Sequence, residues 1–250
     1  MTATKIARKV RGRDFAEASG HGLRCCPTLV GVVEMKTKAE NSYRFEAAHV
    51  SGFMQELVRY VSHGYRYYVT AEVPARKDVA RVDEKLVSGY GIAMSRWARA
   101  RRKRAGKANL QYLRHDRFFV LIATPGEHVF FKRENPSDIR ERALCYGGYE
   151  VRSVLGPDGK WHASVRIADD QYRRVCAHLE ELAPRVSRER LALELEALPF
   201  EPWAPVATQF RALRARVNRA RRRAGVHGDV PMERLRLRRK SLRGFVEKDG

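Results

Sequence analysis

Several polar residues near the middle of the chain could act on a phosphodiester bond. His115 and Asp116 are adjacent at the start of the most apolar run of the sequence, and His128, Glu150 and His162 follow on or beside later predicted strands. Imidazole and carboxylate groups gathered on a sheet can bind a divalent ion, which would stabilise the charge that develops during cleavage. A nuclease or strand-transferase that uses Mg²⁺ or Mn²⁺ is therefore one hypothesis for this chain.

The spacing of these residues argues against that hypothesis. It matches no compact metal-binding motif, and neighbouring residues of a strand point to opposite faces of a sheet, which would separate His115 from Asp116. The sequence also contains no GxGxxG or Walker-type phosphate loop and no HExxH or GxSxG motif. The sequence therefore predicts no cofactor and no metal site, and Mg²⁺ or Mn²⁺ belongs only to the nuclease alternative.

The positive charge of the chain is concentrated in two blocks. The 250 residues carry a formal net charge of +21, from 50 Lys and Arg against 29 Asp and Glu. Residues 94–117 hold +8 of this charge and residues 207–250 hold +10. Charge that served only solubility would be scattered, whereas two dense blocks indicate two surfaces that contact a polyanion. Nucleic acid, DNA or RNA, is the expected partner.

Both blocks supply candidate contacts to nucleic acid. In the first, basic residues lie among aromatic ones, which is typical of single-strand binding, because a base stacks on a ring while an arginine holds the phosphate. In the second, an arginine-rich helix could contact phosphates or read bases in a major groove. The candidates are Arg96, Arg99, Arg101, Arg102, Lys103, Arg104, Lys107, Tyr112, Arg114 and Arg117 in the first block, and Arg211, Arg214, Asn218, Arg219, Arg221, Arg222, Arg236, Arg238, Arg239 and Lys240 in the second.

Two predicted helices present these blocks. Ser95 can cap a helix over residues 96–104, and Gly106 follows its end. Trp97 is the only large apolar residue of this helix, so we expect its ring to anchor the helix on the core. The second helix, over residues 206–224, has an apolar stripe at three- and four-residue steps that can dock on the core.

The periodicity of apolar residues predicts the remaining elements. The expected helices cover residues 44–62, 79–88, 169–182 and 187–198, and the expected strands cover residues 65–73, 110–124, 128–132, 149–155 and 161–167. The uninterrupted apolar run at 118–122 is typical of a central strand that is buried on both faces. This pattern predicts an α+β fold: one antiparallel sheet, ferredoxin-like or split βαβ, with helices on one face, plus a basic C-terminal helix and tail.

These elements divide the chain into three parts. Residues 1–43 form a basic arm with little periodicity, expected to be mobile; residues 44–199 form the α+β core domain; residues 200–250 combine a proline-rich linker, the arginine-rich helix and a basic tail. No apolar run approaches the ~18 residues of a membrane span. The four cysteines have no metal-ligand spacing. We therefore expect a cytoplasmic protein that is associated with the nucleoid or with RNA and not with a membrane.

The run YLRHDRFFVLIATPG, from Tyr112 to Gly126, resembles the central strand of single-tyrosine (HUH-type) transposases. The resemblance implies a ferredoxin-like core and a nucleophilic tyrosine on a later helix, for which Tyr172 is the counterpart. The two metal-binding histidines of that family would fall on Arg117 and Phe119, so both are missing here. The resemblance thus implies a nucleic-acid-binding relative without catalysis, encoded in a mobile element.

Three hypotheses follow for the function. The first is a nucleic-acid-binding protein that grips the phosphate backbone through two basic surfaces. The second is a nuclease or transposase-like enzyme that uses His115, Asp116 and Tyr172. The third is a protein component of a ribonucleoprotein. The sequence predicts neither the oligomeric state nor a choice between DNA and RNA.

Overall fold

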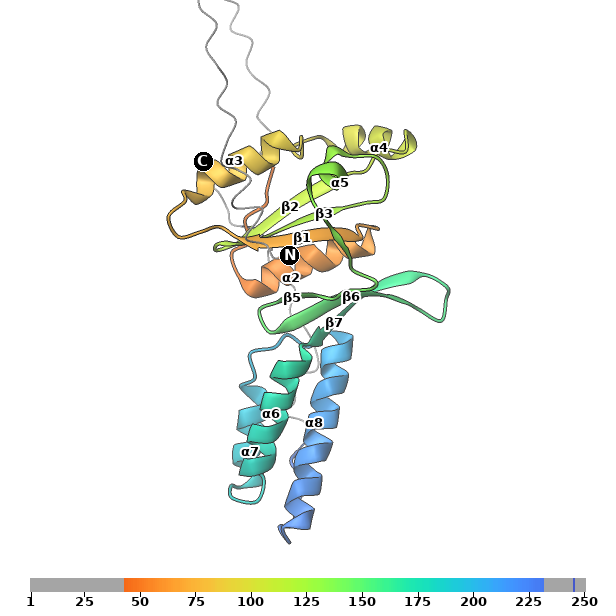
Figure 1. The fold of residues 1–250 in the computed structure, drawn as a ribbon. Coiled ribbons are helices and arrows are strands. Elements are labelled where there is room, and N and C mark those ends of the chain that lie inside the picture. The colour runs from red at the N-terminus through yellow and green to blue at the C-terminus, as the bar shows by residue number, and fades with distance from the viewer. Residues whose placement is uncertain (1–42, 232–244, 246–250) are drawn as a thin grey trace, which may run out of the picture.

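The computed structural model describes residues 43–231 and residue 245 of the chain (Figure 1). The expected N-terminal arm, apart from residue 43, and the tail candidates Arg236, Arg238, Arg239 and Lys240 lie outside the described residues. The described helices are α2 (Val50–Ser62), α3 (Val79–Gly89), α4 (Arg96–Arg104), α5 (Val129–Arg133), α6 (Asp169–Leu182), α7 (Arg188–Glu196) and α8 (Ala204–Arg223). The described strands are β1 (Tyr67–Glu72), β2 (Leu110–His115), β3 (Phe118–Ala123), β4 (Ser137–Asp138), β5 (Leu144–Tyr146), β6 (Tyr149–Leu155) and β7 (Trp161–Ile167). None of these helices is both long and apolar enough to cross a membrane.

The first four strands form an antiparallel sheet in the order β2-β3-β1-β4. Along the chain the elements follow as β1-α3-α4-β2-β3-α5-β4, which is the split βαβ, or ferredoxin-like, arrangement. Leu86 of α3 and Phe130 of α5 are buried in one cluster with Phe119 and Leu121 of β3, so α3 and α5 cover the same face of the sheet. The predicted α+β class is confirmed.

The segment predicted as one strand over residues 110–124 is instead a hairpin of β2 and β3. Strand β3 is buried on both faces, as its apolar run predicts. Phe119 and Leu121 belong to the cluster under α3 and α5, whereas Val120 and Ile122 belong to a second, larger cluster on the opposite face. This division follows from the alternation of side chains along a strand. Helix α2 covers the opposite face of the sheet, where its Phe53 is fully buried. The helices therefore lie on both faces of this sheet, which corrects the expectation of helices on one face.

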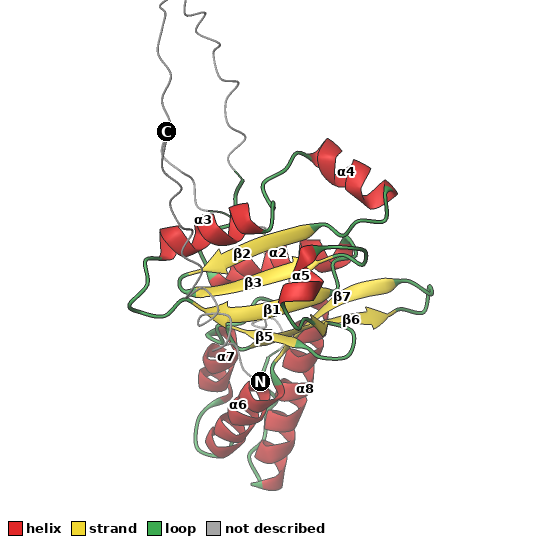
Figure 2. Ribbon diagram, turned by 45° about the horizontal axis from the view of Figure 1, so that its top comes forward, coloured by secondary structure: helices red, strands yellow, loops and turns green. Residues whose placement is uncertain are grey.

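A second antiparallel sheet, of order β5-β6-β7, replaces part of the single sheet that the sequence predicts. The hairpin of β6 and β7 is confirmed, with residues 156–160 as its turn. Val151, Val165 and Ile167 line one face of this sheet and join the larger cluster with residues of α2, α6 and α8. The two sheets therefore share one core, in which α2 packs against both of them (Figure 2).

The segment predicted as a strand over residues 128–132 is instead helix α5. The Nδ1 atom of His128 accepts a hydrogen bond of 3.0 Å from the backbone N–H of Phe130 and so caps the helix. Phe130 is fully buried and Phe131 packs at its edge. Apolar residues in a run this short fit either a strand or a helix, and the cap decides between them here.

Helix α8 belongs to the core and not to a separate C-terminal part. Phe210, Leu213 and Val217 are buried against the sheet and helices of the larger cluster. The segment before α8 is also fixed, because the Tyr149 hydroxyl accepts a hydrogen bond of 2.6 Å from the backbone N–H of Glu201. The packed unit therefore extends well past the predicted boundary at residue 199.

Candidate nucleic-acid interface

Helix α4 is attached to the molecule by arginines and not by apolar side chains. The Ser95 hydroxyl caps it by accepting a hydrogen bond from the N–H of Ala98, and no residue of the helix is buried. Arg99 donates hydrogen bonds to the carbonyl groups of Ile92 and Leu110, at 2.9 and 3.2 Å. Arg102 donates to the carbonyl of Ala108 at 2.9 Å. These two predicted contact residues therefore hold α4 in place and leave its opposite face in solvent.

The outward face of α4 carries a tryptophan among cations. Trp97, Arg101 and Arg104 are spaced by four and three residues, so they share one side of the helix. The Trp97 side chain is 77% exposed, which corrects the expectation that it anchors the helix. We define the α4 face by its exposed side chains: Arg96, Trp97, Arg101, Lys103 and Arg104, with Lys107 just beyond the helix.

No carboxylate of the described residues neutralises the cations of the α4 face. Within residues 43–231, none of them forms an ion pair with an Asp or Glu. At the other end of the molecule some arginines are paired: Arg174, Arg185 and Arg216 pair with Asp170, Glu181 and Glu180. Cations without carboxylate partners create a positive electrostatic potential at the surface. The α4 face therefore attracts anions.

Tyr112 and Arg114, both predicted to contact nucleic acid, lie inside the molecule. The fully buried Tyr112 donates a hydrogen bond of 2.5 Å from its hydroxyl to Asp83 on α3, and burial raises its pKa. Arg114 donates to the same carboxylate at 3.0 Å and pairs with Glu46 at 2.9 Å. Neither side chain is available to a ligand in this arrangement, because both hold α3 on the sheet.

Arg117 is also committed to the fold. Its guanidinium donates hydrogen bonds to the carbonyl groups of Val73, Pro74 and Lys77 in the loop before α3. The Arg117 guanidinium, which the sequence predicts to contact nucleic acid, thus fixes the conformation of this loop.

On α8, the candidates divide in the same way. Asn218 is buried and accepts a hydrogen bond from the N–H of Val230, so its side chain is not presented to a ligand. Arg221 is buried and donates to the carbonyl groups of Ala183 and Val186. Arg214 bonds to the carbonyl of Val230. The exposed candidates of this helix are Arg211, Arg219 and Arg222, and Arg222 pairs with Asp229.

The two predicted surfaces lie far from each other. In both ribbon views α4 lies at one end of the molecule, beside α3, and α8 extends away from the opposite end (Figures 1 and 2). The described parts of the two charge blocks therefore do not form one continuous surface.

Two of the three predicted catalytic residues, His115 and Asp116, lie close together, which corrects the expectation that a strand would separate them. His115 Nδ1 lies 2.7 Å from the Tyr146 hydroxyl and 3.4 Å from Asp116 Oδ2, because Asp116 adopts a left-handed turn with φ of 51°. Burial, with the negative charges of Asp116 and Glu72, raises the pKa of Tyr146 to about 12.

Tyr172 lies elsewhere, on α6, where its hydroxyl donates to the carbonyl of Gln209 on α8. The tyrosine beside His115 is thus Tyr146. In the described part of the chain, no three His, Cys, Asp or Glu side chains are grouped closely enough to hold a metal ion.

A second exposed tryptophan was not among the sequence candidates. Trp161, at the start of β7, is 43% exposed, and the Arg140 guanidinium lies 5.3 Å from its ring centroid. Val154 and Leu155 on β6 are also exposed. The hairpin of β6 and β7 projects to the same side of the molecule as α4 in both views (Figures 1 and 2). Trp161 directly follows the turn over residues 156–160. This position is the sequence signal that could have indicated an exposed side chain.

Comparisons of the chain with models of protein families, with curated proteins and with solved structures found no match.

Proposed function

We propose that the protein binds single-stranded nucleic acid, DNA or RNA, through the α4 face. One observation carries this proposal: a tryptophan that is 77% exposed lies among cations that have no carboxylate partner in the described residues. In the bound state, the indole of Trp97 stacks on an unpaired base, while Arg101 and Arg104 contact the phosphates on either side.

The energetics favour this ligand over other anions. An indole that remains in water forgoes the burial that usually stabilises large apolar side chains, and a stacked base restores that burial. Stacking of one base on an aromatic side chain contributes about 1–3 kcal/mol. A duplex keeps its bases stacked on one another, so it offers phosphates to the arginines and no base face to Trp97. We therefore expect single strands to bind more tightly than duplexes, with little dependence on sequence.

Trp161 offers a second stacking position for a longer strand. The hairpin of β6 and β7, in which Trp161 is the first residue of β7, lies on the same side of the molecule as α4. The Arg140 guanidinium beside the ring is paired with Asp138, so we expect Trp161 to contribute through stacking. A strand that reaches from α4 to the hairpin would contact both rings, whereas a short oligonucleotide would contact only one.

The test is fluorescence anisotropy with labelled single-stranded DNA, single-stranded RNA and duplex DNA at low salt. We expect Trp97→Ala to weaken single-strand binding about 5- to 150-fold, which corresponds to ~1–3 kcal/mol, and Trp97→Phe to retain part of the affinity. We expect Arg101→Glu to weaken it further. Leu193→Ala, which alters another exposed apolar residue, and Arg173→Glu, which reverses an exposed charge on α6, are matched controls.

Equal affinity of the Trp97→Ala variant and the unmodified protein would contradict the proposal. A preference for duplex over single strands would contradict it as well, even if the charge variants weaken binding, because phosphate contacts alone would then explain the interaction.

A further inference from the structure

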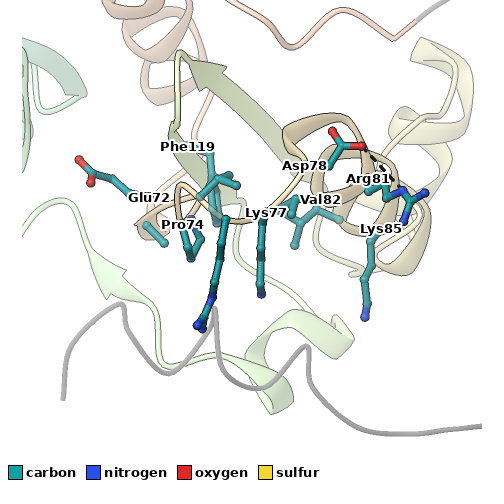
Figure 3. A pocket seen from close by; sticks show the side chains of 12 residues that line it. Glu72, Pro74, Lys77, Asp78, Arg81, Val82, Lys85 and Phe119 are labelled. Atoms are coloured by element: carbon teal, nitrogen blue, oxygen red, sulfur yellow. Dashed lines mark ion pairs between the residues drawn. The ribbon is translucent and has the colours of Figure 1, made fainter.

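A cavity of about 420 Å³ opens between α3 and the edge of the four-stranded sheet (Figure 3). Ala71 of β1 and Phe119 of β3, which are cross-strand partners, form its floor. Val82 and Leu86, one turn apart on α3, form the wall. Small-molecule sites occupy roughly 300–1,000 Å³, so the cavity is of a size to hold one organic ligand.

The packing of α3 explains why this space exists. The hydrogen bond from Tyr112 to Asp83 and the ion pair of Arg114 with Asp83 hold α3 over β2. Toward β1 the sheet carries Ala71, whose methyl side chain fills little of the space below the helix. The space between α3 and β1 is therefore a consequence of how the helix is attached.

The loop at the mouth of the cavity is held in one conformation. Arg117 donates to the carbonyl groups of Val73, Pro74 and Lys77, and the N–H of Lys77 donates to the carbonyl of Pro74 at 2.9 Å. A guanidinium that binds three carbonyls of one loop fixes its geometry before any ligand arrives. The site is thus preformed, which lowers the entropy cost of binding.

The mouth of the cavity is basic. Its cations come from the loop and from α3, where Arg81 and Lys85 are one turn apart; the full set is Arg76, Lys77, Arg81 and Lys85. In Figure 3, Lys77 and Lys85 extend in the same direction on two sides of the opening, whereas Glu72 points away from it. Asp78, the other carboxylate of the lining, caps α3 and lies 3.7 Å from Arg81.

We infer that this cavity binds an organic anion with an unbranched apolar chain, of which a medium-chain carboxylate is the simplest example. The chain would lie on Ala71 and Phe119, and the carboxylate would lie at the mouth among the cations. The floor and wall side chains have no polar atoms, so a nucleobase or sugar there would lose its hydrogen bonds to water without replacement. An alkyl chain loses none. This inference does not depend on nucleic-acid binding.

The experiment is calorimetric titration of the full chain with hexanoate, octanoate and decanoate below their micelle concentrations. Burial of each added methylene should tighten the Kd about fourfold, which corresponds to ~0.8 kcal/mol. 1-Decanol has the same chain as decanoate and no charge, so it should bind more weakly. Adenosine monophosphate tests whether any organic anion suffices, and we expect no binding of it that depends on the cavity.

Two kinds of variant place the ligand in the cavity. Val82→Trp should fill the space and weaken decanoate binding at least tenfold. Arg76→Glu and Arg81→Glu alter exposed side chains that do not contribute to the core. Each of these two variants should weaken the binding of decanoate more than the binding of decanol. Arg101→Glu on α4 is the matched charge control and should leave decanoate binding unchanged.

An affinity that does not change with chain length, or that Val82→Trp leaves intact, would overturn the inference. So would equal loss of affinity in Arg101→Glu and Arg81→Glu, because that result indicates general attraction to a cationic protein. Loss of single-strand binding in the Trp97→Ala variant with normal decanoate titration would leave this inference standing, and the reverse result would leave the α4 proposal standing.

Discussion

The hydroxyl of Tyr112 donates a hydrogen bond of 2.5 Å to the carboxylate of Asp83, and both side chains are buried between the sheet and α3. Arg114 donates to the same carboxylate. Tyr112 and Arg114, which the sequence predicts to contact nucleic acid, therefore hold α3 on β2. Because Tyr112 and Arg114 are held inside the fold, they cannot contact a ligand. Among the described cations of the first charge block, those of the α4 face can.

We expect Tyr112→Phe to lower the free energy of unfolding by about 1–3 kcal/mol, because the buried Asp83 carboxylate loses a donor that water cannot replace. Nucleic-acid affinity should not change. Urea denaturation of this variant beside Tyr67→Phe, a partly exposed tyrosine on the same face of the sheet, measures the effect; Tyr67→Phe should remain within about 0.5 kcal/mol of the unmodified protein. A Tyr112→Phe variant with full stability and weakened nucleic-acid binding would show that the ring contacts the ligand.

Elements that depend on local patterns were predictable. The apolar run of β3 indicates burial on both faces, because no side of it is polar. The turn between β6 and β7 contains Gly159, whose φ of 71° is favourable for glycine. Ser95 caps α4 as predicted, and Asp78 caps α3 from the corresponding position before its first residue. In each case the determining interaction lies within a few residues of the chain.

The roles of individual arginines were not predictable, because an arginine that binds carbonyl groups and one that faces solvent have the same side chain. Arg99 and Arg102 alternate along α4 with Arg101 and Lys103, and only the positions of Ile92, Ala108 and Leu110 determine which two point inward. That information is tertiary. The same reasoning explains why Trp97 was expected to anchor the helix. Apolar side chains usually attach a helix to the core, whereas hydrogen bonds from Arg99 and Arg102 attach α4.

The division into two sheets was also beyond the sequence. Strand β4 consists of Ser137 and Asp138 alone and pairs with Tyr67 and Tyr68 of β1. A strand of two polar residues has no periodicity to detect. Because β4 cannot be predicted, the sequence pattern does not indicate that the first sheet ends there. The hairpin of β6 and β7 is then assigned to the same sheet.

We expect Arg221→Ala to destabilise the protein by at least about 3 kcal/mol, although it removes one of several arginines from a basic helix. The buried guanidinium bonds to the carbonyl groups of Ala183, Val186 and Gly228, and each would be left without that donor. Arg219→Ala, two positions earlier and exposed, should change stability by less than about 0.5 kcal/mol. Thermal or urea unfolding of the two variants makes the comparison, and equal effects would contradict the assigned role of Arg221.

Alkaline pH should destabilise the fold through Tyr172. Burial, with the neighbouring Cys176, raises the pKa of Tyr172 to about 12, above the value of about 10 in an unfolded chain. The neutral phenol therefore stabilises the folded state fully below pH 10, and this contribution is lost as the pH rises toward 12. Tyr172→Phe should show a smaller loss of stability over that interval, measured by urea unfolding at several pH values. Ionisation of Tyr172 near neutral pH, seen by phenolate absorbance in the difference spectrum of the two proteins, would contradict this and would restore the residue as a candidate nucleophile.

The salt dependence of binding reports how many phosphates the α4 face neutralises. Its five exposed cations are Arg96, Arg101, Lys103, Arg104 and Lys107. For single strands each phosphate contact contributes about −0.7 to the slope of log K against log salt concentration, so five contacts predict a slope of roughly −3.5. Between 50 and 200 mM salt, affinity should then fall about 100-fold.

Arg101→Ala removes one of these contacts and should reduce the slope by about 0.7, while Arg173→Ala on α6 should leave it unchanged. Trp97→Ala should lower affinity at every salt concentration and keep the slope, because stacking releases no counterions. Anisotropy titrations of the four proteins over one salt series separate the two contributions. A slope that Arg101→Ala does not alter would mean that the phosphates bind elsewhere, and a slope that changes in Trp97→Ala would mean that the indole positions the cations and does not stack independently of them.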